Sequence, residues 1–423
     1  MNTLISAKEI LAIKHLKIMR IILSLNGAWP GEVLGEKTPL ILKCHRLYIP
    51  FQALGLFIAQ VCYLVKYFKV LNIFSMGHMY ITTFLTVLIC IRGITVCLKK
   101  YRDISRQFLM AFHLIHFKHK SDYHEKIYGI VNKISYYFTI YLLLLTMCGA
   151  ILFNGSPVYN NYKMGAFTGE KRENITLEFS IYYYFYPGFN AEDYFIVCTI
   201  YNFYLSFCTA ICVCFLDLYL SVMIFQIIGH IQILKNNIEN ITKPRTVTGN
   251  TNKIDDTEPS YSMPFSAEEN GSIHTKLVDI VHHHRLIVNF TDDISNFFGP
   301  VLASYNLFHL VSGCLLLFEC SRGADAFARY GPLTVILFGQ LIQISIIFEI
   351  VGYMSEKLID AIYCMPWESM NISNQRSVCI LLHRVQTPIQ VTAMGLVPVG
   401  VQSMATILKS SLSYFAFLRS MDN

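Results

Sequence analysis

Long apolar stretches dominate this 423-residue chain and decide what it can fold into. Seven of them are long enough to cross a bilayer core, which takes about 20 apolar residues in a helix. Inside a bilayer each backbone amide must find its partner within the protein, so such stretches fold as helices. They cover residues 47–68, 74–98, 134–156, 194–228, 295–319, 330–354 and 387–420. The sequence predicts an all-α polytopic membrane protein with seven transmembrane helices.

Lysine and arginine are distributed unevenly between the segments that connect these stretches. If the N-terminus is cytoplasmic, the cytoplasmic segments carry 24 of them and the outer segments and outer span ends carry eight. Because positive charge gathers on the cytoplasmic side, we expect a cytoplasmic N-terminus and an extracellular C-terminus. The net charge of +6 is then a topological signal and not one for nucleic acid.

The predicted spans divide the chain into five parts. They are a cytoplasmic segment at 1–46, helices one to four in 47–228 with an outer loop at 157–192, a cytoplasmic loop at 229–294, helices five and six with a cytoplasmic connection in 295–386, and helix seven in 387–423. Within the cytoplasmic loop, residues 243–274 hold few large apolar side chains, which predicts a disordered insertion.

The outer loop contains two features of interest. Asn174-Ile175-Thr176 is a glycosylation sequon, so Asn174 is the predicted acceptor. An aromatic run at 182–186 is typical of an interfacial belt, and the alternative is a lid over an outward-facing ligand cavity.

The last apolar stretch carries a polar face. Its residues recur at steps of three or four, which places them on one side of a helix: Gln402, Thr406, Ser410, Ser413, Phe417 and Ser420 or Met421. Because lipid tails cannot solvate hydroxyls and amides, this face must meet protein or a water-filled lumen. The bulky Phe417 and Met421 predict a pore lining with an apolar gate. Lys409 fits a cation path poorly, so we orient it toward a subunit boundary and Ser410 toward the lumen.

The outer halves of the second, third and fourth spans combine aromatic residues with an occasional hydroxyl and one glycine. The candidates are Tyr80, Thr83, Phe84, Thr146, Gly149, Phe153, Phe203 and Phe207. Ligand pockets in helix bundles are mostly apolar with a few orienting polar groups. Ordinary membrane helix packing uses the same residue types, so the pattern leaves both interpretations open.

Other polar groups favour structural roles. Asp217 in the fourth stretch is interpreted as pairing with a neighbour near the cytoplasmic boundary, and the alternative is a functional buried carboxylate. The side chains of His282, His283 and His284 point about 100° apart on a helix and cannot converge on a metal, so neither metal nor cofactor is predicted. The chain has no HExxH, GxSxG, Walker or dinucleotide-binding motif, and we do not expect an enzyme.

The C-terminal third resembles insect odorant receptors. The resemblance rests on the runs Tyr363-Cys364-Met365-Pro366-Trp367-Glu368, Leu381-Leu382-His383-Arg384-Val385-Gln386-Thr387-Pro388, Met394-Gly395-Leu396 and Ile407-Leu408-Lys409-Ser410-Ser411-Leu412-Ser413-Tyr414-Phe415-Ala416-Phe417-Leu418. Length and span layout agree over the whole chain.

This resemblance implies an odorant-gated, poorly selective cation channel in the plasma membrane of a sensory neuron. Odorant-specific subunits of the family assemble with a shared co-receptor into a heterotetramer around one pore, and a small volatile odorant or pheromone opens it to permeating cations. The co-receptor has Thr-Tyr-Phe-Met where this chain has Ser413-Tyr414-Phe415-Ala416, which implies a variable, ligand-selecting subunit.

The resemblance also implies roles for single residues. The family's gate positions fall on Phe417 and Met421, and its selectivity-filter glutamine falls on Ser420. The family's pocket pattern on the third span matches Thr146, Gly149 and Phe153, and the match on the second span is looser.

Three other classes compete with this interpretation. A gustatory receptor of the same superfamily usually ends in a Thr-Tyr-(apolar)-Gln-Phe pattern, which is absent. A G-protein-coupled chemosensory receptor requires the opposite orientation and a basic Asp-Arg-Tyr-like turn after its third span. A transporter requires broken helices in both halves, and only Pro398 and Gly400 hint at one.

Overall fold

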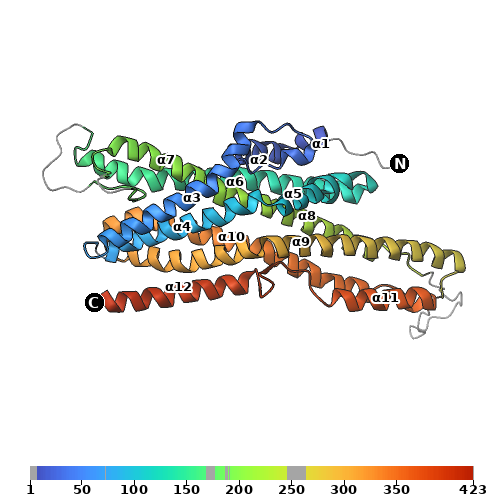
Figure 1. Ribbon diagram of the computed structural model, residues 1–423. Helices are drawn as coiled ribbons and strands as arrows, with labels where there is room; N and C mark the ends of the chain where they lie inside the picture. Colours follow the sequence, from blue (N-terminus) through green and yellow to red (C-terminus); the bar gives the residue numbers. More distant parts are fainter. Residues whose placement is uncertain are drawn as a thin grey trace.

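The computed structural model describes residues 7–71, 73–167, 177–185, 189, 191–244 and 263–422, and the side chains of 73–75, 215, 325, 421 and 422 are not described. Long helices run side by side in one elongated bundle (Figure 1). They are α3 (Leu40–Tyr67), α4 (Ile73–Cys97), α6 (Asp122–Lys163), α7 (Phe195–Ala210), which continues through the π-helical turn η5 (Ile211–Phe215) into α8 (Leu216–Glu239), α9 (Ala267–Cys320), α10 (Ala324–Tyr363) and α12 (Val401–Asp422).

Shorter elements complete the half of the bundle that bears the N-terminus (Figure 1). They are α1 (Ala7–Leu11), α2 (Lys14–Leu25), η1 (Gly31–Leu34), α5 (Lys99–Gln107), the π-helical turn η2 (Phe108–Phe112), η3 (Leu114–His116), η4 (Lys118–Lys120), η6 (Trp367–Ser369) and α11 (Ile372–Val385). The C-terminus lies at the opposite end of the bundle, at the end of α12 (Figure 1).

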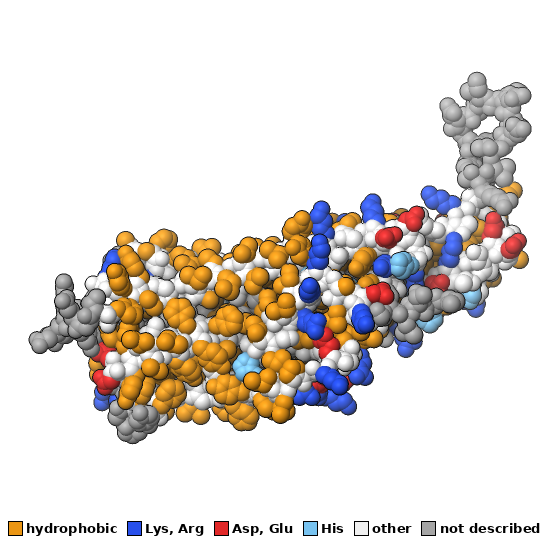
Figure 2. Space-filling model, turned by 90° about the horizontal axis from the view of Figure 1, so that it is seen from above, with side chains coloured by type: hydrophobic (Ala, Val, Ile, Leu, Met, Phe, Trp, Pro, Cys, Tyr) orange, Lys and Arg blue, Asp and Glu red, His pale blue; other side chains and the backbone are white. Residues whose placement is uncertain are grey.

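The two halves differ in surface chemistry. Figure 2 shows a broad apolar surface over one half and charged side chains gathered on the other. On the apolar half, residues such as Phe51, Val65, Leu144 and Ile151 are exposed. Uncovered apolar surface of this extent is unfavourable in water and suits lipid tails. The apolar half is therefore the membrane-embedded part of the protein.

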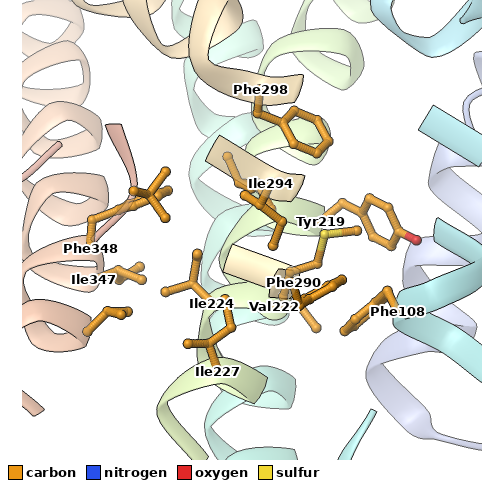
Figure 3. Close-up of a cluster of buried hydrophobic side chains, with 14 of the residues drawn as sticks. Phe108, Tyr219, Val222, Ile224, Ile227, Phe290, Ile294, Phe298, Ile347 and Phe348 are labelled. Carbon is orange, nitrogen blue, oxygen red and sulfur yellow. The ribbon is translucent and has the colours of Figure 1, made fainter. Parts of the chain in front are cut away.

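Helix α8 forms the centre of the core. Apolar side chains cover it on all sides, which is typical of a helix that other helices surround. Tyr219, Val222, Ile224 and Ile227 are fully buried and face side chains from η2, α9 and α10 (Figure 3). The labelled partners in that view are Phe108, Phe290, Ile294, Phe298, Ile347 and Phe348.

Within the described residues, six helical stretches are long and apolar enough to cross a membrane, and each overlaps one of the first six predicted spans. Most extend well beyond the predicted bounds: α6 begins at Asp122 and continues past Pro157 to Lys163. The predicted outer loop at 157–192 therefore begins too early. The seventh predicted span corresponds to α12, whose hydroxyl-rich face lowers its hydropathy.

The prediction of a helix from residue 387 is wrong. Residues 392–398 form a small hairpin in which β1 (Thr392–Ala393) pairs antiparallel with β2 (Val397–Pro398), and α12 begins only at Val401. Met394 and Gly395 both adopt positive φ at the turn, a conformation that is incompatible with a helix. Thr392 is held against α9 because its amide donates to Ser295 Oγ at 2.9 Å.

The predicted cytoplasmic loop at 229–294 is largely helical. Helix α8 continues to Glu239, and α9 begins at Ala267 with a capping box in which Ser266 and Glu269 satisfy each other's backbone amides. The predicted insertion at 243–274 thus ends too late, and its residues 245–262 lie outside the described part of the chain.

Candidate functional site

A cavity of about 550 Å³ opens in the outer half of the apolar bundle. Its walls come from α3, α4, α10 and the segment that joins α6 to α7. The described side chains that line it include Tyr63, Tyr67, His78, Met79, Glu178, Phe179, Tyr182, Tyr183, Tyr184, Arg329 and Tyr330. Most of these groups are aromatic, and the tyrosine hydroxyls, Glu178 and Arg329 add polar atoms to the interior.

The α6–α7 segment is fastened over the cavity as a lid, here defined as residues 177–185. The side chain of Asn161 on α6 forms two hydrogen bonds with the backbone of Glu178. Asn161 Nδ2 donates to the Glu178 carbonyl at 2.6 Å, and Asn161 Oδ1 accepts from the Glu178 amide at 2.9 Å. His78 on α4 donates from Nε2 to the Ser180 carbonyl at 2.9 Å. Asn202 on α7 donates to the Ile181 carbonyl at 3.1 Å. Three helices therefore fix the path of the lid.

Part of the predicted aromatic run belongs to this lid. Tyr183 is buried, and Tyr182 packs edge-on against the ring of His78, with centroids 6.1 Å apart. The His78 ring also stacks on Phe153 at 6.0 Å and lies 6.1 Å from Tyr330. We call His78, Phe153, Tyr182 and Tyr330 the aromatic cluster. It joins α4, α6, the lid and α10, and all of its members except Phe153 line the cavity.

The structure separates the predicted pocket residues into two groups. Thr83 and Thr146 are buried, Phe153 belongs to the aromatic cluster, and a Cβ at Gly149 would contact Ile336 of α10 at 3.7 Å. The other four predicted residues are more than a third exposed on the bundle surface: Tyr80, Phe84, Phe203 and Phe207. Apolar residues cover both the lipid-facing and the inward faces of a membrane helix, so periodicity alone did not distinguish them.

Several site residues escaped the sequence analysis. His78 and Glu319 lie within apolar stretches, and Tyr330 and Arg329 lie at the start of α10. An ionisable residue inside an apolar span is a signal for function, and this signal points to both His78 and Glu319.

Helix α12 presents two different faces. Ile407 and Ser411 are buried, and the Ser411 hydroxyl donates to the Leu310 carbonyl of α9 at 3.2 Å. The opposite face is exposed along its whole length: Gln402, Thr406, Lys409, Ser413, Phe417 and Ser420. We call this set the α12 stripe. Lys409, predicted to face a subunit boundary, lies in the stripe, whereas Ser410, predicted to face the lumen, is half-buried.

Two predicted residues lie outside what the structure describes. The side chain of Met421 is one of them, although its backbone continues α12, and Asn174 is the other.

The first turn of α12 is held by α10. Glu349 accepts a hydrogen bond from the Val401 amide at 2.9 Å, and a Cβ at Gly400 would collide with the same carboxylate oxygen. A carboxylate at a helix N-terminus satisfies a free amide and complements the helix dipole. Helix α10 therefore contacts the cavity through Tyr330 and the start of α12 through Glu349.

Asp217 forms an ion pair inside the bundle. Its Oδ1 lies 2.9 Å from Nη1 of Arg92 on α4, and Arg92 is fully buried. Arg92 also donates to the Val213 carbonyl, in the π-helical turn η5. Asp217 thus has the partner that the structural interpretation predicts. The π-helical turn leaves the Val213 carbonyl free for its contact with Arg92.

The three consecutive histidines diverge. His283 lies 2.9 Å from His230 of α8, His284 is buried in another direction, and His282 is exposed. Within the described residues, no three potential metal ligands come together.

The sequence model of the 7tm Odorant receptor family matches residues 72–412, most of the chain. The chain belongs to the odorant receptor family. Odorant receptor 13a of Drosophila melanogaster is 26% identical over 163 residues, which is 34% of this chain and 38% of that protein. Odorant receptor 10 of Aedes albopictus is 19% identical over 170 residues, 39% of this chain and 44% of that protein. Each alignment thus spans less than half of the curated relative.

Solved structures agree with the fold over nearly the whole length of this odorant receptor. The olfactory receptor OR5 from Machilis hrabei superposes with a TM-score of 0.72 at 15% identity, covering 96% of this chain and 97% of that one. Its complex with eugenol gives a TM-score of 0.74 at 15% identity, covering 98% and 100%. The receptor is therefore a multi-pass membrane protein with the seven-helix fold, as predicted from the sequence.

Proposed function

We propose that this receptor is the odorant-binding subunit of a ligand-gated, non-selective cation channel, which acts with a co-receptor in a heterotetramer in the plasma membrane of a sensory neuron. The α12 stripe is the observation that carries the proposal. A membrane helix that exposes amide, hydroxyl and ammonium groups on its free face requires water or protein beside that face.

One helix cannot enclose a water-filled path. The α12 of a single protomer packs on α9 and α10 on one side only, so other subunits must complete the wall. Phe417, which is 61% exposed, then points into the shared space near the outer end and supplies an apolar constriction. The family's co-receptor is the partner that supplies the remaining helices.

The cavity under the lid is the proposed odorant site. A volatile that buries its apolar surface gains about 25 cal/mol per Å². Small ligands of this kind reach roughly 5–8 kcal/mol in total, which corresponds to affinities near the micromolar range. The eugenol complex of the Machilis hrabei receptor supports an odorant in this fold, although the cavity residues of this chain select their own ligand.

Helix α10 supplies a route from cavity to pore. Tyr330 and Glu349 lie on the same helix, separated along its axis by about 28 Å. A ligand that displaces Tyr330 shifts the helix whose Glu349 holds the first turn of α12. Opening requires that the ligand bind the open state more tightly than the closed one, because equal affinity shifts no population.

Electrophysiology of the full-length chain tests this function. Cells that express the receptor with a co-receptor are expected to show cation currents on exposure to a broad panel of volatiles, and cells that express it alone are expected to show none. Currents without a co-receptor would contradict the proposed assembly. The absence of current with and without the co-receptor would contradict the proposed channel function.

A coupled-receptor mechanism is distinguished by topology. Epitope tags at the two termini of intact cells should be accessible only at the C-terminus. An accessible N-terminus would favour the G-protein-coupled alternative.

A further inference from the structure

A buried carboxylate lies directly behind the cavity wall. Glu319, in the last turn of α9, is fully buried in the outer half of the bundle. Neither of its carboxylate oxygens has a hydrogen-bond partner among the residues that the structure describes. Burying an ionised carboxylate without a partner is costly, so such a group is rarely kept inside a membrane protein without a use.

The fold leaves room for this carboxylate at one point. It faces Gly77 on α4, where a Cβ would collide with Glu319 Oε1. The next residue is His78, which belongs to the aromatic cluster and lines the cavity. Tyr330, the α10 member of the cluster, lies within electrostatic reach of Glu319. Glu319 therefore lies against α4 one residue away from His78, whose side chain lines the cavity.

Neighbouring cations do not neutralise Glu319 by direct contact. Arg329 forms its ion pair with Glu178 of the lid at 2.8 Å and lies over the Tyr330 ring at 5.1 Å. Arg322 lies over the Phe318 ring at 4.7 Å. Both guanidinium groups act on Glu319 only through longer-range attraction.

The surroundings match one ligand chemistry. A protonated amine is recognised by a carboxylate together with the faces of aromatic rings, and both are present where Glu319 meets the aromatic cluster. Most of the remaining cavity wall is aromatic or aliphatic and suits the hydrocarbon part of such a molecule, and its charged side chains are Glu178, Glu192 and Arg329. Resting on the proposed odorant site, we propose that this receptor selects small, largely apolar amines, and that Glu319 binds their ammonium group between His78 and Tyr330.

The first test uses three probes that share one ring skeleton: 2-phenylethylamine, 2-phenylethanol and ethylbenzene. Binding is measured on the full-length receptor in lipid nanodiscs. A charge-assisted hydrogen bond corresponds to about 10- to 100-fold in affinity, so the amine should bind at least about tenfold more tightly than the alcohol. Equal or weaker amine binding would overturn the proposal without any variant.

Variants then assign the preference to Glu319. Glu319→Gln keeps the shape and removes the charge, so amine affinity should fall about tenfold or more while alcohol affinity stays within about threefold. Gly77→Ala, which pushes the carboxylate aside, should reduce amine affinity selectively as well. The matched controls Glu125→Gln and Gly129→Ala lie on α6 in the charged half and should change neither. Equal losses for amine and alcohol, or unchanged amine binding, would make Glu319 merely structural.

Currents recorded with the co-receptor separate this inference from the proposed function. Selective amine binding without any evoked current would contradict the channel and leave the amine site standing. Currents evoked by neutral volatiles, with no amine preference in binding, would support the channel and contradict the amine site.

Discussion

Arg92 and Asp217 join α4 to α8 in the interior of the receptor, with 2.9 Å between guanidinium nitrogen and carboxylate oxygen. The Tyr305 ring of α9 lies 5.5 Å from the same guanidinium group. Three membrane helices thus meet at one buried charge pair. Such a pair contributes little net stability against apolar replacements, yet breaking it strands a charge in a medium that cannot solvate it.

Asp217→Asn is therefore expected to lower the free energy of unfolding by about 3–5 kcal/mol, measured by thermal unfolding of the purified receptor. The double variant Arg92→Met with Asp217→Leu should recover most of that loss, because it leaves no buried charge. A double variant as unstable as the single one would show that the pair matters for another reason.

Replacing Phe417 with serine should raise the current that flows without ligand when the receptor is expressed with its co-receptor. A serine at this position would make the constriction polar, so it would hold water in the resting state as well. Leu412, also exposed but away from the α12 stripe, provides the control: Leu412→Ser should leave the resting current unchanged. If both variants behave alike, Phe417 is no gate.

Gly149 marks a close approach between α6 and α10. Gly149→Leu places a branched side chain against Ile336 and narrows the space beside Phe153, so the rank order of activating volatiles should change. Gly155→Leu is the matched control, because Gly155 lies further along α6 with nothing within 4 Å of its Cβ position. An unaltered odour spectrum for Gly149→Leu would remove this face of α6 from the ligand site.

The N-terminal helix α2 carries a buried histidine, His15, whose burial makes the stability of the protein depend on pH. Burial lowers the pKa of His15 from 6.5 to about 4, since the folded protein cannot solvate its charged form. The stability that the neutral ring contributes is fully present above pH 6.5 and is lost as the pH falls toward 4. His15→Phe should therefore show a smaller drop in melting temperature between pH 6.5 and 4.5 than the unaltered chain. An identical drop would assign the acid sensitivity to other groups.

The sequence alone predicts where the helices lie better than it predicts which of their faces point into the bundle. Apolar length located the first six spans because the bilayer imposes it. The hairpin before α12 was missed although Pro388, Gly395 and Pro398 argued against a helix, because overall hydropathy stayed high there. Phe203 and Phe207 were assigned inward, since aromatic residues suit lipid and cavity equally. Arg92, the partner of Asp217, also contacts the π-helical turn η5, a backbone feature with no signature in composition.

The α12 stripe is tested most directly by cysteine accessibility during gating. Helix α12 has no cysteine of its own, so Ser413→Cys introduces a single new thiol on the stripe, and Leu412→Cys introduces one beside it. A charged thiol reagent applied from outside during odorant exposure should block the cation current of Ser413→Cys and spare both Leu412→Cys and the unaltered receptor. Equal block of both variants, or block of neither, would contradict a water-filled ion path along α12.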